Sequence, residues 1–85
     1  MYELKVKKAS ASKISSEDLD NLIAEFIGTI ETSLSEDSRI KGNKSRIVIE
    51  TTMTEKEIND CVKPALHYFS DDIQLHSLTQ RNKGL

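Results

Sequence analysis

The chain has few of the residues from which metal, disulfide and nucleophilic sites are built. It contains one cysteine, Cys61, and two histidines, His67 and His76, among 85 residues. A single cysteine excludes an internal disulfide, and this cysteine with two histidines nine positions apart matches no zinc-ligand spacing. Cys61 lies on an apolar helical stripe, where a free cysteine is usually an inert core residue. We therefore expect no enzyme activity, no metal and a reducing, cytoplasmic location.

Glycine and long apolar runs are also scarce. The three glycines are Gly28, Gly42 and Gly84, and they form no glycine-rich loop that would hold a phosphate. No wholly apolar run exceeds three residues, as in Ile47–Ile49, so no segment is expected to span a membrane. The first eight residues lack the apolar block of a signal peptide. These absences predict no nucleotide cofactor and no membrane partner.

The overall composition is that of a globular domain. Apolar residues make up 36% of the chain and charged residues 31%. A chain of 85 residues provides for one hydrophobic core, so we expect a single domain over residues 1–85. Its polar end, from about residue 80 to residue 85, is expected to fray.

Two segments carry the signals that begin an amphipathic helix. In Ser15–Asp18 and in Thr54–Glu57, a hydroxyl residue precedes an acid by three positions, as in a capping box. Apolar residues at helical spacing follow: Leu19, Leu22, Ile23, Phe26, Ile27, Ile30 and Leu34, and then Ile58, Cys61, Val62, Ala65, Leu66 and Phe69. The first helix is expected over about 16–34, with a close neighbour as the reason for Gly28. Pro64 predicts a kink or break in the second helix near Val62 and Lys63.

Three segments alternate between apolar and polar residues, as strands with one buried face do. They begin at Tyr2, at Arg46 (extending to Met53) and at Ile73, while Ser38–Ser45 reads as a loop. The predicted fold belongs to the α/β class, as an α+β two-layer sandwich. Its order is β-α-β-α-β, with both helices on one face of a three-stranded sheet. The expected core residues of the sheet are Leu4, Val6, Ile47, Ile49, Ile73 and Leu75.

The other face of this sheet is expected to be uncovered. It would carry Glu3, Lys5, Lys7, Arg46, Val48, Glu50, Gln74, His76 and Leu78. An uncovered face and two open sheet edges favour pairing with another chain. A homodimer is therefore one expectation, and a purely structural assembly subunit is a third functional alternative beside the two below.

Charge is strongly segregated along the chain, although the net charge is only −2. Residues 16–37, called here the acidic segment, hold seven acids and no base, and residues 39–46 hold four bases and no acid. An acidic helix without lysines forgoes the pairs that usually support an exposed helix. We interpret it as a docking face for a basic protein partner, because complementary potentials orient such encounters. The predicted protein-binding residues are Glu17, Asp20, Glu25, Glu31, Glu36 and Asp37.

In its small size, lack of catalytic groups and acidic face, the chain resembles small inhibitors made by phages and mobile elements. Immunity and counter-defence proteins of this kind occupy the basic cleft of an enzyme that handles nucleic acid. The resemblance implies a non-enzymatic inhibitor or adaptor that acts in the cytoplasm, which is the host cytoplasm if a phage encodes it. This is the leading functional hypothesis from the sequence.

The alternative hypothesis is a small RNA- or DNA-binding regulator. It would use a basic sheet face and the 39–46 loop, through Lys5, Lys7, Lys8, Arg39, Lys41, Lys44 and Arg46. Two features oppose it: no aromatic ring is expected on the face for base stacking, and the acidic helix repels phosphate on its own side. Binding to a random oligonucleotide at two salt concentrations separates the alternatives.

Overall fold

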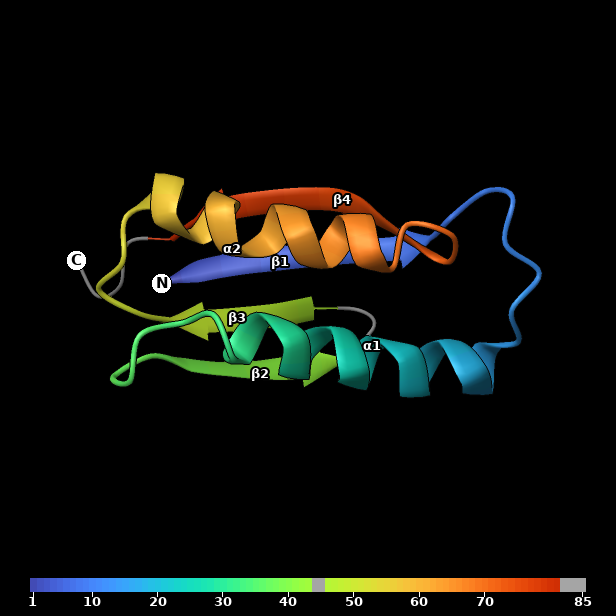
Figure 1. Cartoon of the computed structure of the whole chain (residues 1–85), viewed down its shortest axis with the longest axis horizontal. Helices are drawn as coiled ribbons and strands as arrows, with labels where there is room; N and C mark the ends of the chain where they lie inside the picture. Colours follow the sequence, from blue (N-terminus) through green and yellow to red (C-terminus); the bar gives the residue numbers. More distant parts are fainter. Residues whose placement is uncertain (44–45, 82–85) are drawn as a thin grey trace.

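The computed structural model describes residues 1–43 and 46–81 and consists of two layers. A four-stranded sheet forms one layer, and two helices cover one of its faces (Figure 1). In chain order the elements are β1 (Tyr2–Lys8), α1 (Ser16–Glu31), β2 (Arg39–Asn43), β3 (Arg46–Glu50), α2 (Glu55–Tyr68) and β4 (Ile73–Gln80). The predicted α+β class and the placement of both helices on one face are confirmed.

The sheet has the order β2-β3-β1-β4, and all three strand pairings are antiparallel. Together with the β-α-β-β-α-β element order, this is the split β-α-β arrangement, also called ferredoxin-like. The predicted three-stranded sheet is therefore wrong by one strand. The central strands β1 and β3 bring the beginning of the chain against its middle, and β4 adds its end.

The additional strand is β2, which lies in the segment predicted as a loop. It escapes an alternation search because Ile40 is its one apolar residue, and Ile40 only partly packs on the core. Gly42 has φ 146°, and a Cβ there would lie 2.2 Å from the Arg46 carbonyl oxygen. Gly42 therefore permits the close approach of β2 to β3, so a residue that resembles a loop signal is part of a hairpin.

Both predicted helix starts are confirmed, whereas the end of α1 differs from the prediction. The Ser15 hydroxyl accepts a hydrogen bond from the Asp18 amide, and Thr54 with Glu57 forms a complete capping box. Helix α1 ends at Glu31, not at Leu34, with Thr32 as its C-cap. A Cβ on Gly28 would meet nothing within 4 Å, so the expected close neighbour is absent.

Helix α2 is continuous through Pro64, so the predicted break is wrong. Proline has no backbone N–H, so position 64 cannot donate the helical hydrogen bond to the Asp60 carbonyl one turn earlier. Both Pro64 and Asp60 lie on the exposed side of the helix, so the carbonyl that lacks this partner faces solvent rather than the core. Packing of Ile58, Val62 and Ala65 on the other side holds the helix against the sheet.

The core lies between the sheet and the helices. Its fully buried members include Leu4, Phe26, Ile30, Ile47, Ile49 and Ile58. The rings of Phe26 (α1) and Phe69 (after α2) meet edge to face with centroids 5.8 Å apart, which joins the two helices. Tyr2 is also buried, and its hydroxyl donates to the Met53 carbonyl at 2.8 Å.

A bulge in β4 changes which residues of that strand face the core. Lys5 pairs with Ser77 but Val6 pairs with Leu75, so His76 is the extra residue. The bulge reverses the alternation after His76 and turns Leu78 toward the core, against the prediction, while Leu75 is 40% exposed. Gln80 and Arg81, which were expected to fray, are both paired: Gln80 pairs with Tyr2, and the Arg81 amide donates to the Met1 carbonyl. The rest of the predicted frayed segment, residues 82–85, lies outside the described residues.

Candidate functional site

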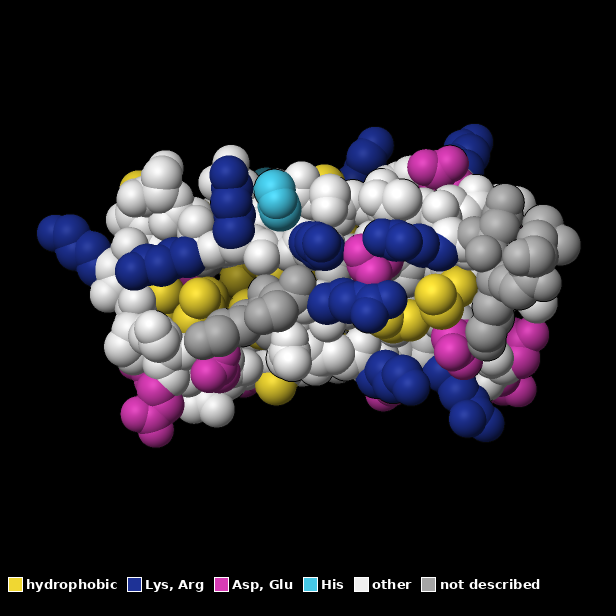
Figure 2. Space-filling model, turned by 180° about the vertical axis from the view of Figure 1, so that it is seen from behind, with side chains coloured by type: hydrophobic (Ala, Val, Ile, Leu, Met, Phe, Trp, Pro, Cys, Tyr) yellow, Lys and Arg dark blue, Asp and Glu magenta, His cyan; other side chains and the backbone are white. Residues whose placement is uncertain are grey.

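The exposed face of the sheet is the candidate site, and the strand register defines its residues. Residues directly opposite one another on neighbouring strands point to the same face. One row crosses all four strands: Lys41 (β2), Val48 (β3), Glu3 (β1) and Thr79 (β4). Neighbouring rows pair Arg39 with Glu50, Asn43 with Arg46, Lys5 with Ser77, and Lys7 with Gln74. Figure 2 shows Lys and Arg side chains across the width of this face.

Most of the basic residues singled out from the sequence meet on this face. Six cations lie on it or at its end, and they are called here the sheet-face cations: Lys5, Lys7, Arg39, Lys41, Arg46 and Arg81. Lys8 pairs with the buried Ile73 and so has the opposite orientation in the strand. Lys44 lies outside the described residues. Because β2 is a strand, Arg39 and Lys41 extend the basic face that β1 and β3 begin.

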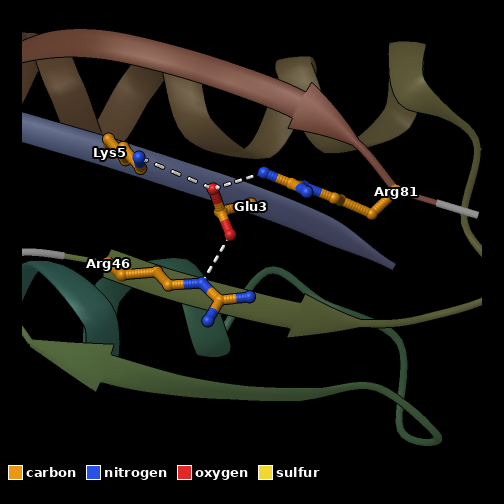
Figure 3. Close-up of polar contacts among 4 residues, drawn as sticks. All are labelled: Glu3, Lys5, Arg46 and Arg81. Carbon is orange, nitrogen blue, oxygen red and sulfur yellow. Dashed lines mark hydrogen bonds and ion pairs between the residues drawn. The ribbon is translucent and has the colours of Figure 1, made fainter. Parts of the chain in front are cut away.

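A buried carboxylate, that of Glu3, lies among three of these cations. Glu3 is 5% exposed, and its two oxygens bond to cations from three parts of the chain. The Arg46 Nε donates to Oε2, Arg81 Nη2 donates to Oε1 at 3.2 Å, and Lys5 Nζ lies 3.8 Å from Oε1 (Figure 3). We call Glu3, Lys5, Arg46 and Arg81 the Glu3 cluster. The cluster ties β1 to β3 and to the segment after β4.

The surroundings of Glu3 keep it ionised. Burial of the carboxyl raises its pKa, since a charge loses hydration when it leaves water. The hydrogen bond and charge of Arg46, with the charges of Arg81 and Lys5, exceed this effect and hold the pKa of Glu3 below its ordinary value of 4.5. The cluster therefore carries three positive charges and one negative charge at neutral pH.

Arg81 is the residue of the candidate site that sequence reasoning missed. It follows the last residue of β4 and was assigned to a frayed tail. Its main-chain bond to Met1 and the register of β4 against β1 bring its guanidinium to Glu3. Nothing in local alternation indicates this, because the placement depends on a strand pairing across 78 positions.

The exposed face offers no aromatic ring among the described residues. Tyr2 and Phe26 are buried in the core between the sheet and the helices, Phe69 packs on Phe26, and Tyr68 is 79% exposed on α2. Val48, half-buried, is the apolar side chain of the row that crosses all four strands. The face is therefore polar and cationic, without a stacking surface.

The predicted acidic residues fall into two groups, and all six are exposed. Glu17, Asp20, Glu25 and Glu31 lie on α1, whereas Glu36 and Asp37 lie in the connection from α1 to β2. No salt bridge joins Glu25, Glu31 or Glu36 to a base in residues 1–43 and 46–81. The acids therefore form a negative surface along α1 and the turn after it.

Asp37 differs from the other acids because its carboxylate has a local structural role. One oxygen accepts from the Ser35 hydroxyl at 2.7 Å, and the other accepts from Thr52 at 3.4 Å. The Ser35 bond is the main reason that the pKa of Asp37 lies below its ordinary value.

Glu31 lines a pocket of about 330 Å³ with Arg39 and Lys41, so the acidic and basic surfaces meet at the β2 edge.

Cys61 is not a full member of the core. It is half-buried, and its thiol donates to the Ser33 carbonyl at 3.4 Å. Burial, with the nearby charges of Asp60 and Glu57, raises the pKa of the thiol. A raised pKa lowers the thiolate fraction and hence the reactivity at neutral pH.

In the described ranges no three His, Cys, Asp or Glu side chains are grouped closely enough to hold a metal ion.

Comparisons with family models, with curated proteins and with solved structures give no significant match for this chain. Within the part of the chain that the structure describes, neither helix has the length and apolar character needed to cross a bilayer. The functional inference therefore depends on the surfaces themselves.

Proposed function

We propose that this protein binds the backbone of single-stranded nucleic acid across the exposed face of its sheet. The observation that carries the proposal is the convergence of the sheet-face cations from β1, β2, β3 and the end of β4 onto one face. Phosphate contacts by lysine and arginine supply most of the affinity in such interfaces. Five of these cations, Lys5, Lys7, Arg39, Lys41 and Arg46, belong to the alternative set from the sequence, and the fold adds Arg81 to them.

The shape of this face favours a single strand over a duplex. Both helices lie on the opposite side of the sheet, so no helix projects from the basic face into a groove (Figure 1). Four strands spaced about 4.8 Å apart present a surface about 14 Å wide, along which one flexible strand can lie.

The side chains of this face predict little preference for one nucleotide sequence over another. In one common class of RNA-binding domain, a four-stranded sheet reads single strands by stacking bases on aromatic rings. This face has no such ring among the described residues, so phosphate charge provides the binding. The six sheet-face cations and the two acids Glu3 and Glu50 give it a net charge of +4.

Salt titration tests the proposal directly. If about four phosphates are neutralised, the logarithm of the binding constant falls with the logarithm of salt concentration at a slope of about −3. Fluorescence anisotropy with a labelled random single strand measures this between 50 and 200 mM salt, a range over which affinity falls about 50-fold. Absence of binding at low salt contradicts the proposal.

Matched variants locate the binding surface. Lys7→Gln with Lys41→Gln removes two cations of the sheet face and leaves the Glu3 cluster intact. We expect affinity to fall about tenfold or more at low salt. The control, Lys56→Gln with Lys63→Gln, removes the same charge from exposed positions of α2 on the other side. Equal losses in the two variants would show that only net charge matters and would contradict a sheet-face site.

A second candidate function is the leading sequence hypothesis, an inhibitor or adaptor that binds a basic protein through the acidic segment. The observation that favours it is the exposure of Glu25, Glu31 and Glu36 without a salt bridge in the described chain. Affinity purification from the native cell tests it with Glu25→Lys/Glu31→Lys against the control Asp60→Lys/Asp71→Lys. Loss of a partner in the first variant alone supports the idea, and retention in both contradicts it.

A further inference from the structure

The cations of the Glu3 cluster retain unused hydrogen-bond donors. Each guanidinium has five N–H donors, and Arg46 uses its Nε while Arg81 uses one terminal nitrogen. In the described part of the chain, neither arginine makes a second ion pair or side-chain hydrogen bond. Their side chains are 55% and 54% exposed, and that of Lys5 is 44% exposed. Three cations are thus held together with donors available to solvent.

Glu3 accounts for this grouping. Three cations in one place repel one another, and the buried carboxylate between them offsets the repulsion. Its bonds also fix the arginine side chains, which reduces the entropy lost when they bind a ligand. Figure 3 shows the two guanidinium groups approaching Glu3 from different strands, Arg46 from β3 and Arg81 from the end of β4. Glu3 is therefore a positioning residue.

The charge of the cluster indicates which phosphate it suits. Three cations and one carboxylate leave a net charge of +2 at one point. A phosphodiester within a strand carries one negative charge, whereas a phosphomonoester carries about −1.5 to −2 at neutral pH and has three terminal oxygens. The planar arginine donors match such oxygens in pairs.

We propose that the Glu3 cluster is a subsite for a phosphomonoester, the terminal phosphate of a nucleic-acid strand. The proposal rests on the function proposed above and deepens it. The remaining sheet-face cations contact internal phosphates of the strand, and the cluster places its phosphorylated end. The protein then prefers strands that end in phosphate over strands of the same sequence that end in hydroxyl.

The test uses three single strands and measures anisotropy with the intact chain. The first is a 5′-phosphorylated strand, and the second is the same strand with a 5′-hydroxyl. The third is a 5′-hydroxyl strand that is one nucleotide longer, which matches the first in number of phosphates. We expect the phosphorylated strand to bind about tenfold more tightly than either hydroxyl strand. Equal binding of all three overturns the subsite but leaves the proposed function standing, and absence of all binding overturns both.

Variants of the cluster separate positioning from general charge. Arg81→Gln is expected to reduce the preference for phosphate to about twofold or less, because one fork of donors is lost. Glu3→Gln raises the net positive charge, so overall affinity rises or is unchanged while the preference falls. Lys7→Gln, outside the cluster, weakens binding of all three strands alike and leaves the preference unchanged. A preference that survives in both cluster variants, each shown to be folded by circular dichroism, overturns the assignment.

Discussion

The basic sheet face and the acidic segment are both charged surfaces, but they are built in different ways. The acids lie within 22 consecutive residues, and Glu25, Glu31 and Glu36 are exposed without a salt bridge in the described chain. The sheet-face cations come from positions 5 to 81, and three of them, Lys5, Arg46 and Arg81, contact a buried carboxylate. A sequence shows the first kind of surface at once, whereas only folding assembles the second. Two of the cations on the assembled surface, Arg46 and Arg81, are also hydrogen-bonded to the carboxylate between them.

The largest effect on stability is expected from a substitution in the hydrophobic core, because the elements that carry both charged surfaces pack on it. Phe26→Ala removes the ring that joins α1 to Phe69 and leaves a cavity between the helices. The free energy of unfolding should fall by about 3–5 kcal/mol. Urea denaturation followed by circular dichroism measures the loss. The exposed Asn21→Ala in the same helix is the control and should change stability by no more than about 0.5 kcal/mol. A loss near 1 kcal/mol in Phe26→Ala would contradict this packing.

Each charged surface contains one glycine, Gly42 in β2 and Gly28 in α1, and replacement of these two by alanine should have opposite effects on stability. Gly42→Ala places a Cβ against the Arg46 carbonyl at a positive φ and should destabilise the chain by about 1–3 kcal/mol. The strain acts on the β2–β3 hairpin, so oligonucleotide affinity should fall as well. Gly28→Ala meets no neighbouring atom in the middle of α1 and should stabilise by about 0.5–1 kcal/mol. Thermal denaturation of both variants checks the signs, and a stabilising Gly42→Ala would contradict the hairpin geometry.

Reversal of one charge on each surface should affect stability to very different extents. Arg46→Glu brings a carboxylate beside the buried Glu3, so two negative charges repel one another where hydration is poor. Glu25→Lys changes an exposed side chain and should alter stability by no more than about 0.5 kcal/mol. We expect the melting temperature to fall several times further in Arg46→Glu. Equal shifts in the two variants would mean that the Glu3 cluster does not stabilise the fold.

The smallest expected effect is a dependence of stability on pH. The pKa of Glu3 in the folded protein lies below 4.5, so the unfolded chain binds a proton more readily at this group. The stabilising contribution is therefore complete above pH 4.5 and is lost as the pH falls through the lowered pKa. Melting curves between pH 7 and pH 3 should show this decline, and Glu3→Gln should make it shallower. An unchanged pH profile in Glu3→Gln would contradict the role of the carboxylate.

Much of the fold follows from local patterns in the sequence. The Ser15 and Thr54 caps, the helical stripes and the alternation of β1 and β3 predicted two helices on one face of a sheet, as found. The β2 strand was missed because its single inward apolar residue, Ile40, gives no alternating pattern. The bulge at His76 reversed the expected faces of the second half of β4.

The candidate site was less accessible to prediction. Lys5, Lys7 and Arg46 were placed on the exposed face from alternation alone, and this placement is confirmed. The central role of Glu3 was not visible, since an acid among lysines resembles an ordinary solvated position. Arg81 depends on the pairing of the two ends of the chain, which no local pattern encodes.

Nuclear magnetic resonance mapping of a random single-stranded oligonucleotide on ¹⁵N-labelled protein tests the sheet-face assignment most directly. The amide signals of β1, β2, β3 and Arg81 should shift on titration at low salt, while those of α1 remain in place. Shifts confined to α1 and the turn after it, or none at all, would contradict binding of nucleic acid by the basic sheet face.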